Sequence, residues 1–119
     1  MKKIVLTIIA VLSMTMTYAE TTKNNEKSVY AMKVNDHALA RSLALTEYQQ
    51  YAVSEIMTRF EWDMQRVAKS NDADRQKKLR KAVSRNLTSL SKVLTPEQYR
   101  KYTVLINATF VNRGIIHMM

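Results

Sequence analysis

The chain has 119 residues, a formal net charge of +9, one Gly, one Pro and no Cys. So few turn-forming residues favour a single, mostly helical domain. The lack of Cys excludes disulfides and a cysteine nucleophile, so helix packing must hold the fold together.

Residues 1–19 have the pattern of a signal peptide. Lys2 and Lys3 form a basic start, residues 4–16 form an apolar run, and the small-residue stretch ending at Ala19 is typical of a cleavage site. The apolar run is shorter than the roughly 20 residues of a membrane-spanning helix. We therefore expect cleavage near Ala19 and a periplasmic or secreted protein, with a short buried N-terminal helix as the alternative.

A flexible segment is expected over residues 20–35, before a helical domain over residues 36–119. The segment starts polar and has no sustained period, as disordered termini do. Its apolar residues from Val29 to Val34 leave open whether this part packs onto the body. Asn35 or Asp36 is then in position to cap a short helix that runs to Ala44.

The first long helix is expected from Thr46 to Lys69. Met57 widens its apolar stripe, whereas Trp62 lies well off it. An off-stripe Trp indicates either a second contact surface or a partly buried edge. The stripe residues recur at steps of three and four, and they are Val53, Ile56, Phe60, Met64 and Val67.

A polar turn at residues 70–74 leads into a second long helix, expected from Asp74 to Val93. A short loop between two amphipathic helices makes them antiparallel neighbours. The apolar stripe of this helix is the most regular in the chain, and it comprises Leu79, Val83, Leu87, Leu90 and Leu94.

A third long helix begins at Thr95 and stops at Gly114, a residue suited to the left-handed position after a helix. Its apolar face contains Tyr99, Tyr102, Ile106 and Phe110. The sequence therefore predicts an all-α fold, namely an antiparallel long-helix hairpin with a third C-terminal helix and a short N-terminal helix.

The second long helix carries charges of one sign. From residue 75 to residue 92 it has seven positive side chains and no acid. Surfaces that serve only solubility normally mix signs, although a merely solvated face remains the alternative. Four of the cations point away from the apolar stripe at about 100° per residue, and they are Lys77, Lys81, Arg85 and Lys92.

The pentapeptide L-T-x-x-Q occurs twice, as Leu45-Thr46-Glu47-Tyr48-Gln49 and as Leu94-Thr95-Pro96-Glu97-Gln98. Thr followed by Gln three residues later is a capping box, in which each residue satisfies a backbone amide of the other. Both copies therefore predict helix starts. Pro96 suits the first helical position of the second copy, where its missing N–H is not needed.

These two copies, in a basic helical chain behind a signal peptide, resemble the paired LTxxQ motifs of the Spy/CpxP family of envelope proteins. The resemblance implies a curved helical hairpin, usually an antiparallel dimer with a concave basic surface. It also implies an ATP-independent periplasmic chaperone or a modulator of envelope stress signalling, while others in the wider group sense metals. The residues matching the motif, with a chiefly structural role, are Leu45, Thr46, Gln49, Leu94, Thr95 and Gln98.

The functional hypothesis is an exported binding protein that captures unfolded or acidic clients on a basic and apolar helix surface. The basic part is the four-residue face named above. The apolar part comprises side chains left over after the core is filled, namely Tyr48, Tyr51, Met57 and Trp62. The alternative is a regulatory or scaffolding protein of the envelope stress response that docks on one dedicated partner. A Tyr-rich third helix and its Gly114 stop lie outside the motif, so the scaffold without chaperone activity also remains open.

An enzyme is not expected, and neither is a cofactor. The only two His residues, His37 and His117, lie near opposite ends of the chain, and no glycine-rich loop is present to hold a phosphate. No metal site is predicted, although His117-Met118-Met119 has donors that suit a soft metal. Export argues against nucleic acid as a partner, while an anionic envelope surface remains compatible with the charge.

Overall fold

The computed structural model describes residues 29–115, and this part of the chain is all-helical, without strands. The predicted all-α class is therefore confirmed for these residues. The expected signal peptide and the His117-Met118-Met119 tail lie outside them. The four helices are Asp36–Leu43 (α4), Glu47–Lys69 (α5), Asp72–Ser91 (α6) and Pro96–Asn112 (α7).

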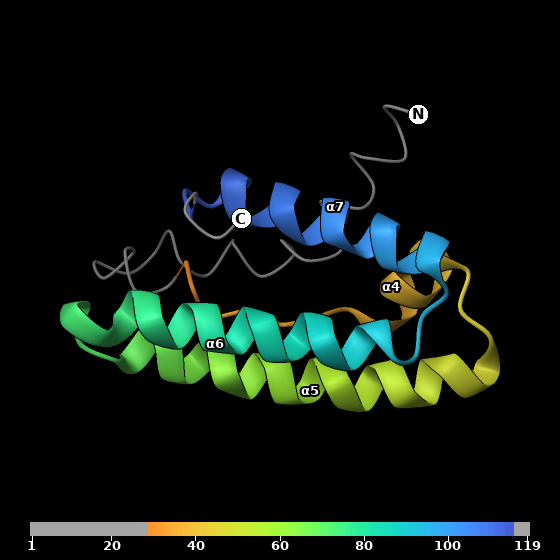
Figure 1. Ribbon diagram of the computed structural model, residues 1–119, viewed down its shortest axis with the longest axis horizontal. Helices are drawn as coiled ribbons and strands as arrows, with labels where there is room; N and C mark the ends of the chain where they lie inside the picture. Colours follow the sequence, from red (N-terminus) through yellow and green to blue (C-terminus); the bar gives the residue numbers. More distant parts are fainter. Residues whose placement is uncertain (1–28, 116–119) are drawn as a thin grey trace.

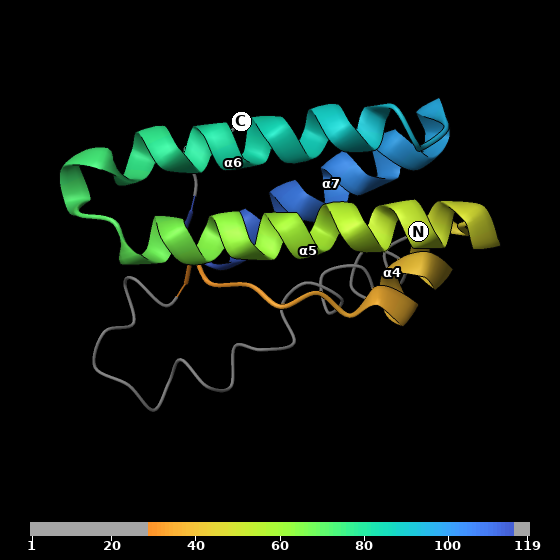
Figure 2. The same cartoon turned by 90° about the horizontal axis from the view of Figure 1, so that it is seen from below.

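The long helices α5 and α6 lie side by side, connected through residues 70–71 (Figures 1 and 2). They share more contacts than any other pair of described helices. Figure 2 places α7 behind the two and between them, and α4 at the end of the molecule where α5 begins. One side of the α5–α6 pair is thus covered by α7.

The core is built from the apolar stripes of the three long helices. The side chains of Phe60, Leu79, Leu90, Tyr102 and Phe110 are 0–1% exposed. Burying each such side chain contributes about 1.5–3 kcal/mol. The predicted inward faces of the long helices are therefore largely confirmed.

The segment before α4 packs onto the body instead of being flexible to residue 35. Met32 and Val34 are buried, and the Val34 N–H donates to Glu61 Oε2 at 2.6 Å. Arg113 Nη1 donates to the carbonyl oxygens of Val29 at 3.0 Å and Ala31 at 2.8 Å. The expected boundary of the flexible segment is therefore wrong for residues 29–35, which run alongside α5 in Figure 2.

Helix ends follow local capping chemistry. Asn71, not a later residue, caps α6 by accepting from the Asp74 N–H at 3.0 Å, so this helix begins at Asp72. After α7, Gly114 has a φ of +83°, and the Ile115 N–H donates to the Phe110 carbonyl at 2.7 Å. This is the predicted glycine stop, with Ile115 buried behind it.

Candidate functional site

Both L-T-x-x-Q copies form complete capping boxes. The Gln49 N–H donates to Thr46 Oγ1 at 3.1 Å, and the Thr46 N–H donates back to Gln49 Oε1 at 3.0 Å. In the second copy the corresponding distances between Gln98 and Thr95 are 3.1 and 2.9 Å. The predicted starts of α5 and α7 are confirmed, and each box satisfies two backbone amides.

The two boxes are also joined to each other through their glutamines. Gln49 Nε2 donates to Gln98 Oε1 at 2.8 Å, and Gln98 Nε2 donates to Gln49 Oε1 at 3.2 Å. Each amide also reaches the chain that precedes the other box, at the carbonyl oxygens of Val93 (3.1 Å) and Leu43 (3.1 Å). We call this arrangement the glutamine clasp. The identical spacing of the two motifs predicts two caps, but not their contact.

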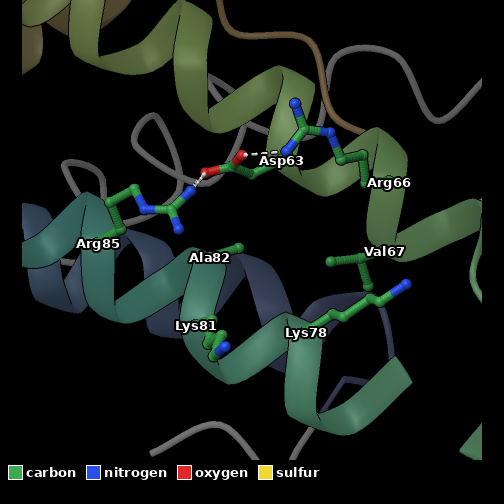
Figure 3. Close-up of a pocket in the computed structure, with 7 residues that line it drawn as sticks. All are labelled: Asp63, Arg66, Val67, Lys78, Lys81, Ala82 and Arg85. Atoms are coloured by element: carbon green, nitrogen blue, oxygen red, sulfur yellow. Dashed lines mark hydrogen bonds and ion pairs between the residues drawn. The ribbon is translucent and has the colours of Figure 1, made fainter. Parts of the chain in front are cut away.

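The predicted basic face is divided by the structure. Its four cations are all exposed: Lys77, Lys81 and Arg85 lie on α6, and Lys92 is the residue directly after its end. Only Lys81 and Arg85 line a pocket between α5 and α6, whereas Lys77 and Lys92 do not. The pocket, called the seam pocket below, has a volume of about 180 Å³ and is lined by Asp63, Arg66, Val67, Lys78, Lys81, Ala82 and Arg85 (Figure 3).

One buried carboxylate organises the seam pocket. Asp63 Oδ2 accepts from Arg85 Nη1 at 3.0 Å, while Asp63 Oδ1 lies 3.7 Å from Arg66 Nη1. Its side chain is 9% exposed, against 53% for Arg85 and 72% for Arg66. Figure 3 shows Asp63 between the two arginines, with Lys78 reaching across from α6 toward Val67. The pocket thus has four cations and one acid in its lining.

Sequence reasoning missed Asp63, Arg66 and Lys78 as members of this site. A signal for Asp63 was present, because it lies three residues after Phe60 and four before Val67. That spacing puts a carboxylate on the core-facing stripe of the helix. A charge in that position requires a cationic partner from a neighbouring element.

The predicted apolar contact residues are mostly exposed. Tyr48, Tyr51 and Trp62 are 83%, 81% and 65% exposed. At 100° per residue they fall within an arc of about 60° on the outer side of α5. Trp62 is therefore a surface residue and not a partly buried edge. We call these three side chains the aromatic stripe.

Met57 is the exception, and its assignment to a contact surface is wrong. Its side chain is 0% exposed because it widens the core stripe. The Met57 sulfur accepts a hydrogen bond from Asn86 Nδ2 at 3.5 Å, and the Tyr102 hydroxyl donates to Asn86 Oδ1 at 2.6 Å. Burial raises the pKa of Tyr102 far above its ordinary value, with the Asn86 hydrogen bond opposing this in part. This polar cluster joins α5, α6 and α7 inside the core.

The aromatic stripe and the seam pocket meet in a shallow groove. The groove has a volume of about 580 Å³, and it shares Asp63, Arg66 and Arg85 with the seam pocket. Its other lining residues are Ser54, Glu55, Thr58, Arg59 and Trp62. An exposed indole ring and three guanidinium groups therefore line one continuous surface.

Within residues 29–115 no three His, Cys, Asp or Glu side chains come together in a way that could hold a metal ion. No helix in the same range has the length and apolarity needed to cross a membrane.

Comparison of the chain with protein-family models, with curated proteins and with solved structures finds no match.

Proposed function

We propose that this chain is an exported helical binding protein that captures unfolded or acidic protein clients, in the manner of an ATP-independent periplasmic chaperone. An antiparallel hairpin of α5 and α6 would form its scaffold, with α7 packed behind it. The observation that carries the proposal is the position of Trp62. Its ring is exposed in a groove that also contains Arg59, Arg66 and Arg85.

Two physical effects support client capture on this surface. Cations attract acidic chains over a Debye length of about 8 Å at physiological salt, which raises the rate of encounter. Exposed aromatic rings then hold apolar segments, because burying their area is favourable. Aromatic and Arg side chains are also the residues most enriched at the centres of protein interfaces.

The test is light scattering of an aggregating acidic client, with and without the purified protein. The aromatic variant carries Tyr48→Ser, Tyr51→Ser and Trp62→Ser. The matched control carries Val104→Ser and Val111→Ser, which change exposed apolar side chains of α7. Suppression of aggregation by the native chain and by the control, but not by the aromatic variant, supports the proposal. Equal suppression by all three chains, or none by the native chain, contradicts it.

A charge variant separates the electrostatic part. Lys81→Glu with Arg85→Glu reverses two charges at the seam pocket. Lys77→Glu with Lys92→Glu reverses two charges outside the pocket, one on α6 and one directly after its end. We expect the first pair to slow client capture more than the second at low salt. The difference should shrink at high salt, where exposed charges are screened.

A dedicated partner in the envelope stress response is the second candidate function. The ion pair between Asp63 and Arg85 fixes one guanidinium group, which favours a partner of defined shape. Affinity capture from an envelope extract distinguishes the two functions. One stoichiometric partner supports a regulatory or scaffolding role, whereas many unfolded proteins support the chaperone.

A homodimer that packed through the aromatic stripe would compete with clients for it. Burial of the aromatic stripe between two copies would remove it from clients, so the oligomeric state must be measured first. Sedimentation velocity of the native chain and of the aromatic variant gives this directly. A dimer that the aromatic substitutions convert into a monomer would assign the stripe to self-association.

A further inference from the structure

The seam pocket concentrates positive charge that the rest of the described chain does not neutralise. Arg66, Lys78, Lys81 and Arg85 line it together with a single carboxylate, that of Asp63. Within residues 29–115 neither Lys78 nor Lys81 forms an ion pair. Like charges on neighbouring turns of a helix repel by a few tenths of a kcal/mol. An anion in the pocket would relieve this repulsion.

We propose that the seam pocket binds the phosphate monoester group of a small ligand. This site shares Lys81, Arg85 and Trp62 with the proposed client surface. The two activities are still distinguishable, because binding of a small molecule in the pocket needs neither an unfolded chain nor Tyr48 and Tyr51. The result of the phosphate-binding experiment therefore does not decide the proposed function, which the light-scattering experiment tests.

The first argument is the orientation of Arg85. Asp63 is almost fully buried and holds Arg85 through Nη1 at 3.0 Å. A guanidinium group has five N–H donors in a fixed plane, and no other hydrogen bond of Arg85 occurs within residues 29–115. The remaining donors are thus directed by the ion pair and stay available to a ligand. Such preorganisation lowers the entropy lost on binding.

The second argument is the match between charge and ligand. A phosphate monoester carries a charge of about −1.5 to −2 at pH 7 and has three strong acceptor oxygens. Cations that approach from two helices can contact these oxygens from different sides, whereas a carboxylate offers two oxygens and one charge. Since Arg and Lys both bind phosphate well, the set of four cations suits the doubly charged group.

The third argument is size. A pocket of about 180 Å³ accepts a phosphate group but not a folded protein element. It is continuous with the groove through Asp63, Arg66 and Arg85, and the groove also contains Trp62. The organic part of a phosphate ester would therefore lie against the indole ring. Phenyl phosphate has both features and is a suitable probe.

The only Trp of the chain reports on binding, since its environment changes when the groove is filled. We expect phenyl phosphate to change Trp62 fluorescence saturably at about pH 7.5 and roughly physiological salt. Phenyl sulfate has a similar shape but a single charge, and it should bind at least about fivefold more weakly. Lowering the pH to about 5 should remove most of that difference, because the second phosphate pKa is about 6.

Matched lysine variants test whether the pocket itself is responsible. Lys78→Gln with Lys81→Gln removes two cations that line the pocket. Lys77→Gln with Lys92→Gln removes two exposed cations that do not line it, one on α6 and one directly after its end. We expect the affinity for phenyl phosphate to fall by about tenfold or more in the first variant, the size expected for lost charge-assisted hydrogen bonds. The control should change it less than about twofold. Circular dichroism checks that both variants keep their helices.

The phosphate group can come from a soluble ester or from a lipid headgroup, and a second probe distinguishes these sources. Vesicles of phosphatidylcholine with phosphatidic acid present the same group on a membrane surface. Binding in either form that depends on Lys78 and Lys81 supports the proposal, and the form that binds more tightly identifies the source. Equal losses in the two lysine variants, or no saturable binding in either form, overturn it.

Discussion

Gln49 and Gln98, which are 49 residues apart in the sequence, exchange two hydrogen bonds through their side-chain amides. Each glutamine also caps its own helix. The glutamine clasp therefore couples the two motifs. Substituting either glutamine removes the cap of its own helix, its hydrogen bonds to the other glutamine, and its hydrogen bond to a backbone carbonyl that precedes the other motif. The start of α5 is thereby tied to the start of α7.

The clasp predicts energetic coupling between these two residues. Gln49→Ala and Gln98→Ala should each lower the free energy of unfolding by about 1–3 kcal/mol, because each removes several hydrogen bonds and leaves polar groups without partners. The double variant should lose less than the sum, with a coupling of about 1 kcal/mol. Urea denaturation of the four chains measures this. Gln65→Ala, an exposed site on α5, serves as a control that should change stability by no more than about 0.5 kcal/mol. Strict additivity of the two losses would contradict the clasp.

Tyr102 predicts a loss of stability in alkali. Burial raises its pKa in the folded state, whereas the unfolded state titrates near 10. The stabilisation is thus fully present below about pH 10 and is lost as the pH rises above it, by up to about 1.4 kcal/mol per pH unit. Comparing the native chain with Tyr102→Phe by denaturation from about pH 8 to about pH 11 isolates this effect, since the variant lacks the titrating group. Parallel pH profiles of the two chains would be inconsistent with a buried, neutral Tyr102.

At neutral pH the same substitution should be destabilising for a different reason. Tyr102→Phe leaves Asn86 Oδ1 without its 2.6 Å hydrogen bond inside the core. A buried polar group without a partner costs about 1–3 kcal/mol. Thermal unfolding at neutral pH measures the loss, and Tyr99→Phe, at a partly exposed position on the same helix, gives the matched comparison. An unchanged melting temperature for Tyr102→Phe would contradict the buried network.

Arg113 is predicted to hold residues 29–35 against the body. It donates to the carbonyl oxygens of Val29 and Ala31, and burial of its guanidinium group lowers its pKa. Arg113→Ala should therefore speed proteolysis and amide exchange in that segment more than in α6. Arg100→Ala changes an exposed arginine of α7, the helix that ends directly before Arg113, and should leave both rates nearly unchanged. Equal protection of the segment in both variants would argue against this role.

Asp63 is predicted to stabilise the contact between α5 and α6 through its ion pair with Arg85, in which only Asp63 is buried. Asp63→Asn should lower the free energy of unfolding by about 1 kcal/mol, a modest figure because Arg85 is about half exposed. The matched control is Glu55→Gln, which neutralises an exposed carboxylate on the same helix. Urea denaturation compares the two variants, and an equal effect of both changes would contradict a special role for Asp63.

The sequence predicts the helices well because their signals are local. Thr46 and Thr95 mark the starts of α5 and α7, and regular apolar steps such as Leu79 to Val83 identify the buried faces. The packing of residues 29–35 is harder to predict, because it depends on Arg113 at the other end of the chain. No local pattern encodes such a contact.

The candidate site is predicted in part for the same reason. Helical phase shows that Trp62 is outside the core stripe, and its exposure follows from that. The helical positions of the cations do not show which of them face a neighbouring helix. The sequence therefore groups Lys77 and Lys92 with Lys81 and leaves out Lys78, although only Lys78 and Lys81 of these four line the seam pocket. Only the pairing of α5 with α6 distinguishes them.

The carboxylate at position 63 has a consequence for how the chain could be improved. It occupies a buried, core-facing place, and replacing an ion pair such as Asp63 and Arg85 as a whole with apolar residues is often neutral or stabilising, whereas removing one partner alone is destabilising. Selection for thermal stability alone would therefore favour apolar side chains at Asp63 and its partner, and these would fill the seam pocket between α5 and α6. Robustness and the capacity to hold a ligand thus oppose each other at this ion pair.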